Sequence, residues 1–166
     1  MLALAVLTVG FLGILTLLAQ SLHISKTISN ETTATYLAAE GIEVTKNLID
    51  HDVYYQLAGF GGGWGACFQP LSAGGSNNYG FDYAQTSCPP PNNSDSFFYY
   101  DPATHLYSYT NSGGAIMTGF KRRIRVTMNT DPTLPEITVQ SIVSWTTGPF
   151  TSQSVNLEDD FYNWHP

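Results

Sequence analysis

The chain has 166 residues and a formal net charge of −7. This length accommodates one ordinary domain plus an additional element. The acidic balance argues against a general nucleic-acid-binding protein, because contacts with phosphates require a positively charged surface. Hydrophobic residues make up 43% of the sequence, and their longest uninterrupted concentration is at the N-terminus.

Residues 1–19 contain no charged side chain, and their only polar residues are Thr8 and Thr16. At 1.5 Å per residue, a helix of this stretch is about 28 Å long, which is close to the thickness of the hydrocarbon layer of a bilayer. The N-terminal stretch is therefore predicted to be a membrane-inserting helix.

Helical periodicity continues beyond this apolar stretch. Residues 21–52 contain no proline and a single glycine, Gly41, which is a candidate for curvature or close helix contact. Apolar residues recur there at helical spacing: Leu22, Ile24, Ile28, Leu37, Ala38, Ile42, Leu48 and Ile49. We predict one helix over residues 1–52, with residues 1–20 in a membrane or filament core and the remainder packed on a soluble head.

The head is predicted to span residues 53–166. It begins with a change of composition, since residues 59–65 include five glycines and residues 88–93 include three consecutive prolines. Such clusters interrupt regular structure. Residues 56–96 are therefore predicted to be mostly loop, with one short strand near residues 79–83.

The two cysteines are Cys67 and Cys88. Behind a membrane-inserting segment both are expected to face an oxidising compartment, where a disulfide forms readily. Such a bond would restrain the loop between them and would contribute about 3 kcal/mol if unstrained. The alternative is a pair of buried, unpaired thiols.

Strands are predicted for the C-terminal part of the chain. Residues 97–100 and 105–109 are rich in aromatic side chains and flank the turn sequence Asp101–Thr104, which predicts a hairpin. Residues 120–129 alternate, with Phe120, Ile124, Val126 and Met128 on one face and Lys121, Arg123, Arg125 and Thr127 on the other.

A further alternating run comprises Ile137, Val139, Val143 and Trp145, with Ser141 interrupting it, and residues 152–157 supply another strand. One face of such strands is available to pack on the helix. The predicted fold is therefore α+β, a long N-terminal helix packed on an antiparallel sheet within residues 97–164.

Several segments resemble the type IV pilin and pseudopilin superfamily. The run Met1–Gly13 is similar to the stretch that follows the family glutamate in minor-pilin-like subunits, and Tyr36–Glu43 resembles the middle of the family's helix. The ending, with Val143–Trp145 and Asn163–Trp164, is similar as well. The resemblance covers the helix strongly and the C-terminal sheet moderately, whereas residues 56–96 match nothing in the family.

The resemblance implies a structural filament subunit and no enzyme. It implies leader cleavage by a prepilin peptidase, N-terminal methylation, residence in the cytoplasmic membrane before assembly, and polymerisation with identical subunits and other pilins by separate machinery. The extracellular filament would serve adhesion, motility, DNA uptake or secretion. Small residues that would allow close helix approach in its core are Ala3, Ala5, Gly10 and Gly13.

One departure from the family concerns the N-terminus. The family pattern begins with a basic leader, a glycine and a phenylalanine-led run containing a glutamate. On this alignment the sequence begins about six residues inside the processed helix. Glu31 and Glu40 lie too far along the helix to replace the family glutamate.

Two other interpretations of the N-terminal segment remain. A signal peptide would have a basic residue at its start, whereas the first basic residue here is Lys26, and the periodicity continues past any cleavage site. A single-pass anchor would make the chain a monomeric extracytoplasmic binding module that acts through the loops of residues 56–96. Such anchors rarely continue as a helix for thirty more residues.

Residues 121–125 form the only basic cluster, Lys-Arg-Arg-Ile-Arg. One interpretation is contact with DNA or another polyanion. The other is the solvated face of a strand, which also discourages pairing at the edge of a sheet. In a filament, Lys121, Arg123 and Arg125 could pair with Glu40 and Glu43 of a neighbouring subunit.

No pattern indicates a catalytic centre, a cofactor or a metal. The four histidines lack the spacing of metal ligands, and the glycine-rich run lacks the Gly-Lys-Ser/Thr ending of a phosphate loop. Residues 92–95, Asn-Asn-Ser-Asp, offer oxygen ligands suited to calcium without the twelve-residue loop pattern. Residues 30–32 and 92–94 match the glycosylation sequon.

Overall fold

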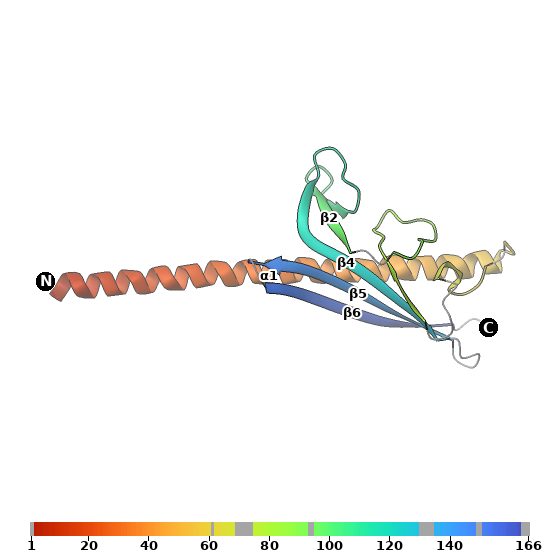
Figure 1. The fold of residues 1–166 in the computed structure, drawn as a ribbon, viewed down its shortest axis with the longest axis horizontal. Coiled ribbons are helices and arrows are strands. Elements are labelled where there is room, and N and C mark those ends of the chain that lie inside the picture. Colours follow the sequence, from red (N-terminus) through yellow and green to blue (C-terminus); the bar gives the residue numbers. More distant parts are fainter. Residues whose placement is uncertain are drawn as a thin grey trace. The chain divides into compact units, whose positions relative to one another are not determined.

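The structure is a computed structural model whose described residues form one long helix, one short 3-10 helix and six strands (Figure 1). It describes residues 2–60, 62–68, 75–92, 95–129, 135–148 and 151–163. The chain divides into two compact units, Met1–Thr33 and Ala34–Pro166, which are described separately.

The helix α1 is continuous from Leu2 to Leu57. It ends later than the predicted position 52 because the residue that terminates it is Gly59. The N–H of Phe60 donates to the carbonyl of Tyr55 at 3.1 Å, and the N–H of Gly59 donates to the carbonyl of Gln56 at 3.1 Å. These two bonds, with Gly59 at φ 77°, form a Schellman motif, which satisfies carbonyls that the helix end leaves free.

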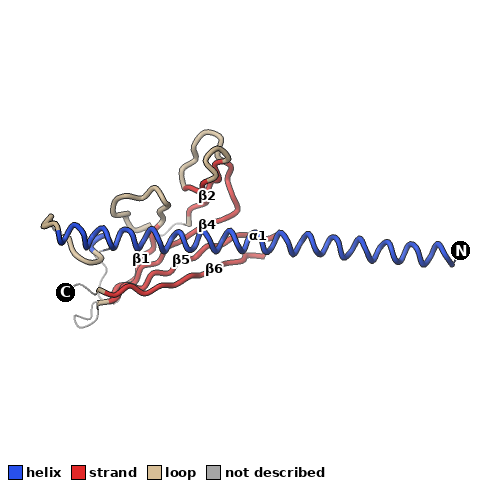
Figure 2. Tube along the Cα trace, turned by 180° about the vertical axis from the view of Figure 1, so that it is seen from behind, coloured by secondary structure: helices blue, strands red, loops and turns tan. Residues whose placement is uncertain are grey.

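The remaining elements are a 3-10 helix and six antiparallel strands: η1 (Ala66–Phe68), β1 (Ser76–Tyr79), β2 (Ser96–Asp101), β3 (Leu106–Ser108), β4 (Ile116–Asn129), β5 (Glu136–Thr147) and β6 (Thr151–Tyr162). The sheet order is β3-β2-β4-β5-β6, and β1 also pairs with β4 (Figure 2). The predicted α+β fold is therefore confirmed.

The strand predictions were correct in kind and less accurate in extent. The predicted hairpin is formed by β2 and β3, with Tyr100 paired with Tyr107. The predicted strand at 79–83 is wrong in position, because β1 ends at Tyr79 and Tyr83 lies in a turn. The strand predicted at 152–157 continues to Tyr162, since it pairs with β5 along its whole length.

One face of the sheet is buried against the second half of α1. Ile124, Val126 and Met128 of β4 are buried, as the alternation predicts. Ser141 does not interrupt β5, because it occupies a buried inward position of the same face. Arg122 also occupies an inward position, which the prediction left unassigned.

Two apolar clusters lie between the second half of α1 and the sheet. The first contains Val44, Leu48, Ile49, Cys67, Phe68, Tyr79, Phe81, Ile124, Val126, Met128, Ile137 and Val139. The second contains Ala34, Leu37, Ala38, Phe98, Val143 and Trp145. Both use helix residues spaced three and four apart, so the same stripe of α1 faces the whole core.

The predicted close contact at Gly41 is present. A β-carbon at Gly41 would collide with Ser141 Oγ and would lie 3.3 Å from side-chain carbons of Arg122 and Ile124. The glycine therefore lets α1 approach β5 more closely than any larger residue would.

The loop region is joined to the core by a disulfide and two buried carboxylates. Cys67 and Cys88 form the predicted disulfide. Asp52 of α1 accepts the N–H of Cys67 at 2.7 Å. Asp82 accepts the hydroxyl of Ser108 at 2.7 Å and the N–H of Tyr109 at 2.9 Å. These contacts explain how a region with little regular structure is held against the head.

Candidate interaction surfaces

The first half of α1 exposes a continuous apolar surface. Large hydrophobic side chains along it are all exposed: Leu4, Val6, Leu7, Val9, Phe11, Leu12, Ile14, Leu15, Leu17, Leu18, Leu22, Ile24 and Ile28. Soluble monomers rarely expose contiguous apolar area on this scale, so the surface indicates contact with a membrane or another protein. By length and composition, α1 contains one segment that could cross a membrane.

The polar groups of this apolar stretch are satisfied locally. Thr16 donates its hydroxyl hydrogen to the carbonyl of Gly13 at 2.8 Å. A threonine bonded in this way presents no free donor to its surroundings. The stretch therefore suits lipid or a packed protein interior, where an unsatisfied polar group would be costly.

The small residues predicted for close helix packing lie on this half of the helix. Ala3 is exposed, and a β-carbon at Gly10 or Gly13 would meet no described atom within 4 Å. The backbone of Ala5 is helical, and its side chain lies outside the described residues. The packing role of these four residues stays a prediction.

A buried arginine organises the centre of the head. Nη1 of Arg122 donates to the carbonyl of Leu37 at 2.6 Å and to Oε1 of Glu40 at 3.2 Å. Nη2 donates to the carbonyl of Phe81 at 2.6 Å, and the guanidinium lies 4.8 Å from the centre of the Phe98 ring. One side chain thus connects α1, the loop after β1, and strands β2 and β4.

The ion pair with Arg122 changes the expectation for the two glutamates. Glu40 is engaged by Arg122 of its own chain, so it is not a free partner for another molecule. Glu43 is exposed and forms no ion pair among the described residues. Of the two, Glu43 is therefore the better candidate for contact with another molecule.

The predicted basic row lies on the outer face of β4, opposite the core. Lys121 stands over the ring of Phe97, with Nζ 4.3 Å from its centre. Arg123 pairs with Asp95 at 2.6 Å, and Arg125 donates to the side chain of Asn78 at 3.5 Å. Asp95 neutralises one of the three charges, and the other two cations contact neutral neighbours of the same face, which favours the solvated-face interpretation over a polyanion site.

Two possible metal sites can be compared with the structure. Ligand atoms of Asp52, Cys67 and Cys88 lie within 4.8 Å of one another. The two sulfurs are bonded to each other and supply no thiolate. In the predicted calcium segment, Asn93 and Ser94 lie outside the described residues, and the carboxylate of Asp95 is occupied by Arg123.

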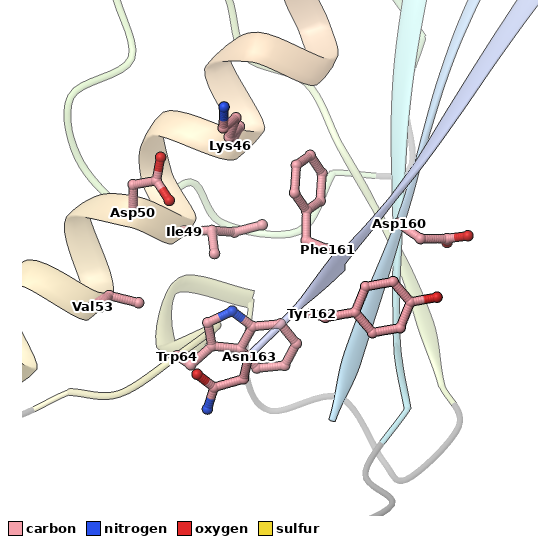
Figure 3. A pocket seen from close by; sticks show the side chains of 9 residues that line it. All are labelled: Lys46, Ile49, Asp50, Val53, Trp64, Asp160, Phe161, Tyr162 and Asn163. Carbon is pink, nitrogen blue, oxygen red and sulfur yellow. The ribbon is translucent and has the colours of Figure 1, made fainter. Parts of the chain in front are cut away.

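An open cavity of about 370 Å³ lies between the end of α1 and β6 (Figure 3). Ile49, Val53, Trp64 and Phe161 form its apolar interior. Lys46 and Asp50 of α1 stand at its border, with Asn163 below. Asp160 and Tyr162 also border the cavity, but their side chains point away from it.

A second cavity, of about 290 Å³, lies along the same line of contact between α1 and β6. It is lined by Ala39, Ile42 and Glu43 of the helix and by Leu157, Glu158 and Asp159 of the strand. Helix positions 39, 42 and 43 recur seven residues later as 46, 49 and 50 in the first cavity. We call this pair of cavities the α1–β6 groove.

The rim of the α1–β6 groove is acidic. Glu43, Asp50 and Asp159 oppose the single cation Lys46, and none of these three acids forms an ion pair among the described residues. Glu158 also lines the second cavity, but its carboxylate accepts a hydrogen bond from the Gln140 side chain on the outer face of the sheet. Asp159 pairs with inward-facing Val139, so it occupies the helix-facing side of β6 between Leu157 and Phe161. Sequence reasoning missed this groove, because its two walls are more than a hundred residues apart in the chain.

Comparison of the chain with protein-family models, with curated proteins and with solved structures gave no match. The functional assignment therefore depends on the surfaces described above.

Proposed function

We propose that this protein is a structural subunit of a type IV pilin-like filament. The observation that carries the proposal is the continuity of α1, whose first half is apolar and exposed while its second half forms part of the core of a β-rich head. A simple anchor requires only about 20 apolar residues and no continuation into the head.

The apolar half of α1 suits two successive environments. It would hold the subunit in the cytoplasmic membrane before assembly, and identical helices would replace the lipid in the filament core. Gly10 and Gly13 would then allow neighbouring backbones to approach, as small residues do between helices in membranes. The head would cover the outside of an extracellular filament.

The proposal includes partners that act before and during assembly. A prepilin peptidase would remove a leader, and separate assembly proteins would drive polymerisation. The filament as a whole would act in adhesion, motility, DNA uptake or secretion. The role of this subunit would be structural, without a cofactor or catalytic centre.

The second candidate is a membrane-anchored binding module that acts as a monomer. The cavity between α1 and β6 favours it, because its volume lies in the range of small-ligand sites and its interior contains Trp64 and Phe161. The two candidates differ in one observable property, the assembly of the protein into filaments.

Electron microscopy of sheared surface material from cells expressing the tagged full-length protein tests the proposal. We expect filaments that are labelled along their length or at their ends by antibody against the tag. Labelling confined to membranes, with none on filaments in cells that assemble other filaments normally, would contradict the proposal and favour the monomeric module.

A further inference from the structure

The disulfide joins two cysteines that lie in different surroundings beside one carboxylate. Cys67 is buried, whereas Cys88 is exposed. One oxygen of Asp52 and the two sulfur atoms all lie within 4.8 Å of one another. Asp52 is itself buried, and it accepts the N–H of Cys67 at 2.7 Å. A group that can accept a proton is therefore held next to the sulfur atoms.

Contacts other than the disulfide hold both cysteines in place. Cys67 belongs to η1, whose next residue, Phe68, is fully buried. After Cys88, the N–H of Asn92 donates to the carbonyl of Asn78 in β1 at 2.7 Å. These contacts do not involve the sulfur atoms. We therefore expect the folded head to bring the two thiols together before the bond between them forms.

The surroundings of Cys67 make formation of this bond difficult without a base. The nucleophile in disulfide formation is the thiolate, and the thiol itself reacts poorly. Cys67 is part of the first apolar cluster, and burial disfavours the charged form of a thiol. A base beside the thiol removes this obstacle, because it takes the proton as the sulfur attacks.

The environment of Asp52 also suits the role of a base. Burial raises the pKa of its carboxyl above the ordinary value, against the opposing effects of the Cys67 N–H and of His51. A carboxylate whose pKa is raised accepts a proton more readily than an ordinary one. The exposed thiol of Cys88 needs no such help, since water can take its proton.

We infer that Asp52 is the proton acceptor for Cys67 when the disulfide forms. In the first step the Cys88 thiolate attacks a disulfide oxidant. A mixed disulfide forms at Cys88, the bond between the two halves of the oxidant breaks, and one half leaves as a thiolate that takes a proton from water.

The second step closes the bond within the protein. The Asp52 carboxylate takes the thiol proton of Cys67, and the Cys67 sulfur attacks Sγ of Cys88. The bond between the two cysteines forms as the bond to the second half of the oxidant breaks, and that half leaves as a thiolate. Two thiols of the protein are oxidised, and one disulfide of the oxidant is reduced to two thiols.

A purely structural role for Asp52 makes a different prediction. The carboxylate would then serve only to accept the N–H of Cys67 and to hold the loop region on α1. Asp52→Asn keeps an oxygen that can accept this N–H, but its amide cannot take the proton of a thiol. The variant should close its disulfide at the wild-type rate if the role is structural, and more slowly if Asp52 is the base.

Reoxidation of the full-length protein in detergent tests the inference. The protein is reduced, freed of reductant and mixed with glutathione disulfide near neutral pH, and samples are alkylated at intervals and weighed by mass spectrometry. We expect Asp52→Asn to slow the second step about tenfold or more, with the mixed disulfide of Cys88 accumulating. Asp50→Asn is the matched control, because Asp50 is exposed on the same helix and should react like the wild type.

Equal rates in the wild type and in Asp52→Asn would overturn the inference. A reduced head that has lost its fold would give the same result, since Asp52 would no longer lie beside the thiols. Serine variants test the order of the steps. Glutathione should join Cys88 in Cys67→Ser faster than it joins Cys67 in Cys88→Ser, and the reverse would contradict attack by Cys88 in the first step.

The pH dependence supplies a readout that a structural role would not change. At about pH 9.5, above the ordinary thiol pKa of about 8.5, the thiol loses its proton without a base. The difference between the wild type and Asp52→Asn should therefore shrink as the pH rises from neutral. His51→Gln, which removes the neighbouring imidazole that acts on the carboxyl, should keep the wild-type pattern. A difference that stays constant with pH would overturn the inference.

The inference is independent of the proposed function. Both experiments use the isolated protein and require no assembly. Failure of the role of Asp52 would leave the filament proposal standing, and absence of filaments would leave the role of Asp52 standing.

Discussion

The two halves of α1 have the same secondary structure and opposite surroundings. Between Leu4 and Ile28 the large apolar side chains are exposed, whereas Leu37, Leu48 and Ile49 are buried in the head. The formation of a helix therefore does not determine whether its side chains are buried or exposed. The difference comes from the distribution of side chains, which are apolar all round in the first half and apolar on one stripe in the second.

This contrast indicates what holds each half in place. The second half is held by specific contacts, chiefly the fully buried Arg122 and the close approach at Gly41. The first half makes no such contacts within the described chain, and in the proposed function it depends on lipid or on other copies. Substitutions in the two halves should therefore affect different measurements, head stability in one case and membrane retention or assembly in the other.

Replacement of Arg122 should have the largest effect on the head. Arg122→Ala would leave the carbonyls of Leu37 and Phe81 without their donor and Glu40 without its partner. Loss of one member of a buried pair costs about 3–5 kcal/mol. We expect a fall of this order in the free energy of unfolding, measured by denaturant titration of the full-length protein in detergent.

Arg123→Ala is the matched control for this experiment. Arg123 follows Arg122 in the sequence, but its ion pair with Asp95 is one-third exposed on both sides. Exposed pairs contribute about 0–1 kcal/mol. A similar loss of stability in both variants would show that the buried position of Arg122 is not what matters.

A charge in the first half should affect membrane retention. Leu12→Arg replaces an exposed leucine near the middle of the apolar stretch. The change disfavours membrane insertion by about 3 kcal/mol at the centre of a spanning helix. We expect the protein to move from the membrane fraction to the soluble or degraded fraction, while Ser21→Arg, beyond the span, retains it. An unchanged membrane fraction for Leu12→Arg would contradict the contrast between the two halves.

The two kinds of glycine should respond differently to alanine. Gly41→Ala would force its β-carbon against Ser141 Oγ, and overpacking of this kind costs about 1–3 kcal/mol. In Gly41→Ala/Ser141→Ala the colliding oxygen is absent, so part of the loss should be recovered. Gly13→Ala meets nothing within 4 Å among the described residues and should leave thermal unfolding of the head unchanged. Equal losses from Gly41→Ala and Gly13→Ala would contradict this interpretation.

The smallest effect is expected at Asp52. Burial raises the pKa of this carboxyl above its ordinary value of 3.8, against the opposing effects of the Cys67 N–H and of His51. Above pH 3.8 the unfolded chain loses the proton before the folded one does, so stability falls as the pH rises towards the folded-state pKa.

Asp52→Asn removes this proton while keeping an acceptor for the N–H of Cys67. Its thermal midpoint should therefore change less with pH, from pH 3.8 upwards, than that of the wild type. An unchanged slope in the variant would show that Asp52 titrates at its ordinary value.

Much of this fold can be predicted from the sequence because its signals are local. The apolar run, the absence of proline before position 52 and the strict alternation in 120–129 all depend on near neighbours in the chain. The same alternation could have placed Arg122 inward, because Arg122 lies two residues before Ile124 and four before Val126, on the same face of the strand. Its charge argued for the surface, and only the partners from α1 and the loop make its burial tolerable.

The interaction surfaces are predictable only in part. The exposed apolar half of α1 follows from composition alone, and the disulfide from compartment and cysteine number. The α1–β6 groove depends on the pairing of β6 with β5 and on the distance at which Gly41 allows α1 to pack. Neither quantity is encoded in the spacing of nearby residues.

The disulfide has a consequence for proteolysis. Cys67 and Cys88 enclose the residues between them in a covalent ring, so hydrolysis of any one peptide bond between them leaves both fragments joined. A protein cut there would keep its full mass under non-reducing conditions and separate into two bands after reduction. Cleavage of this protein between the two cysteines could therefore pass unnoticed until a reductant is added.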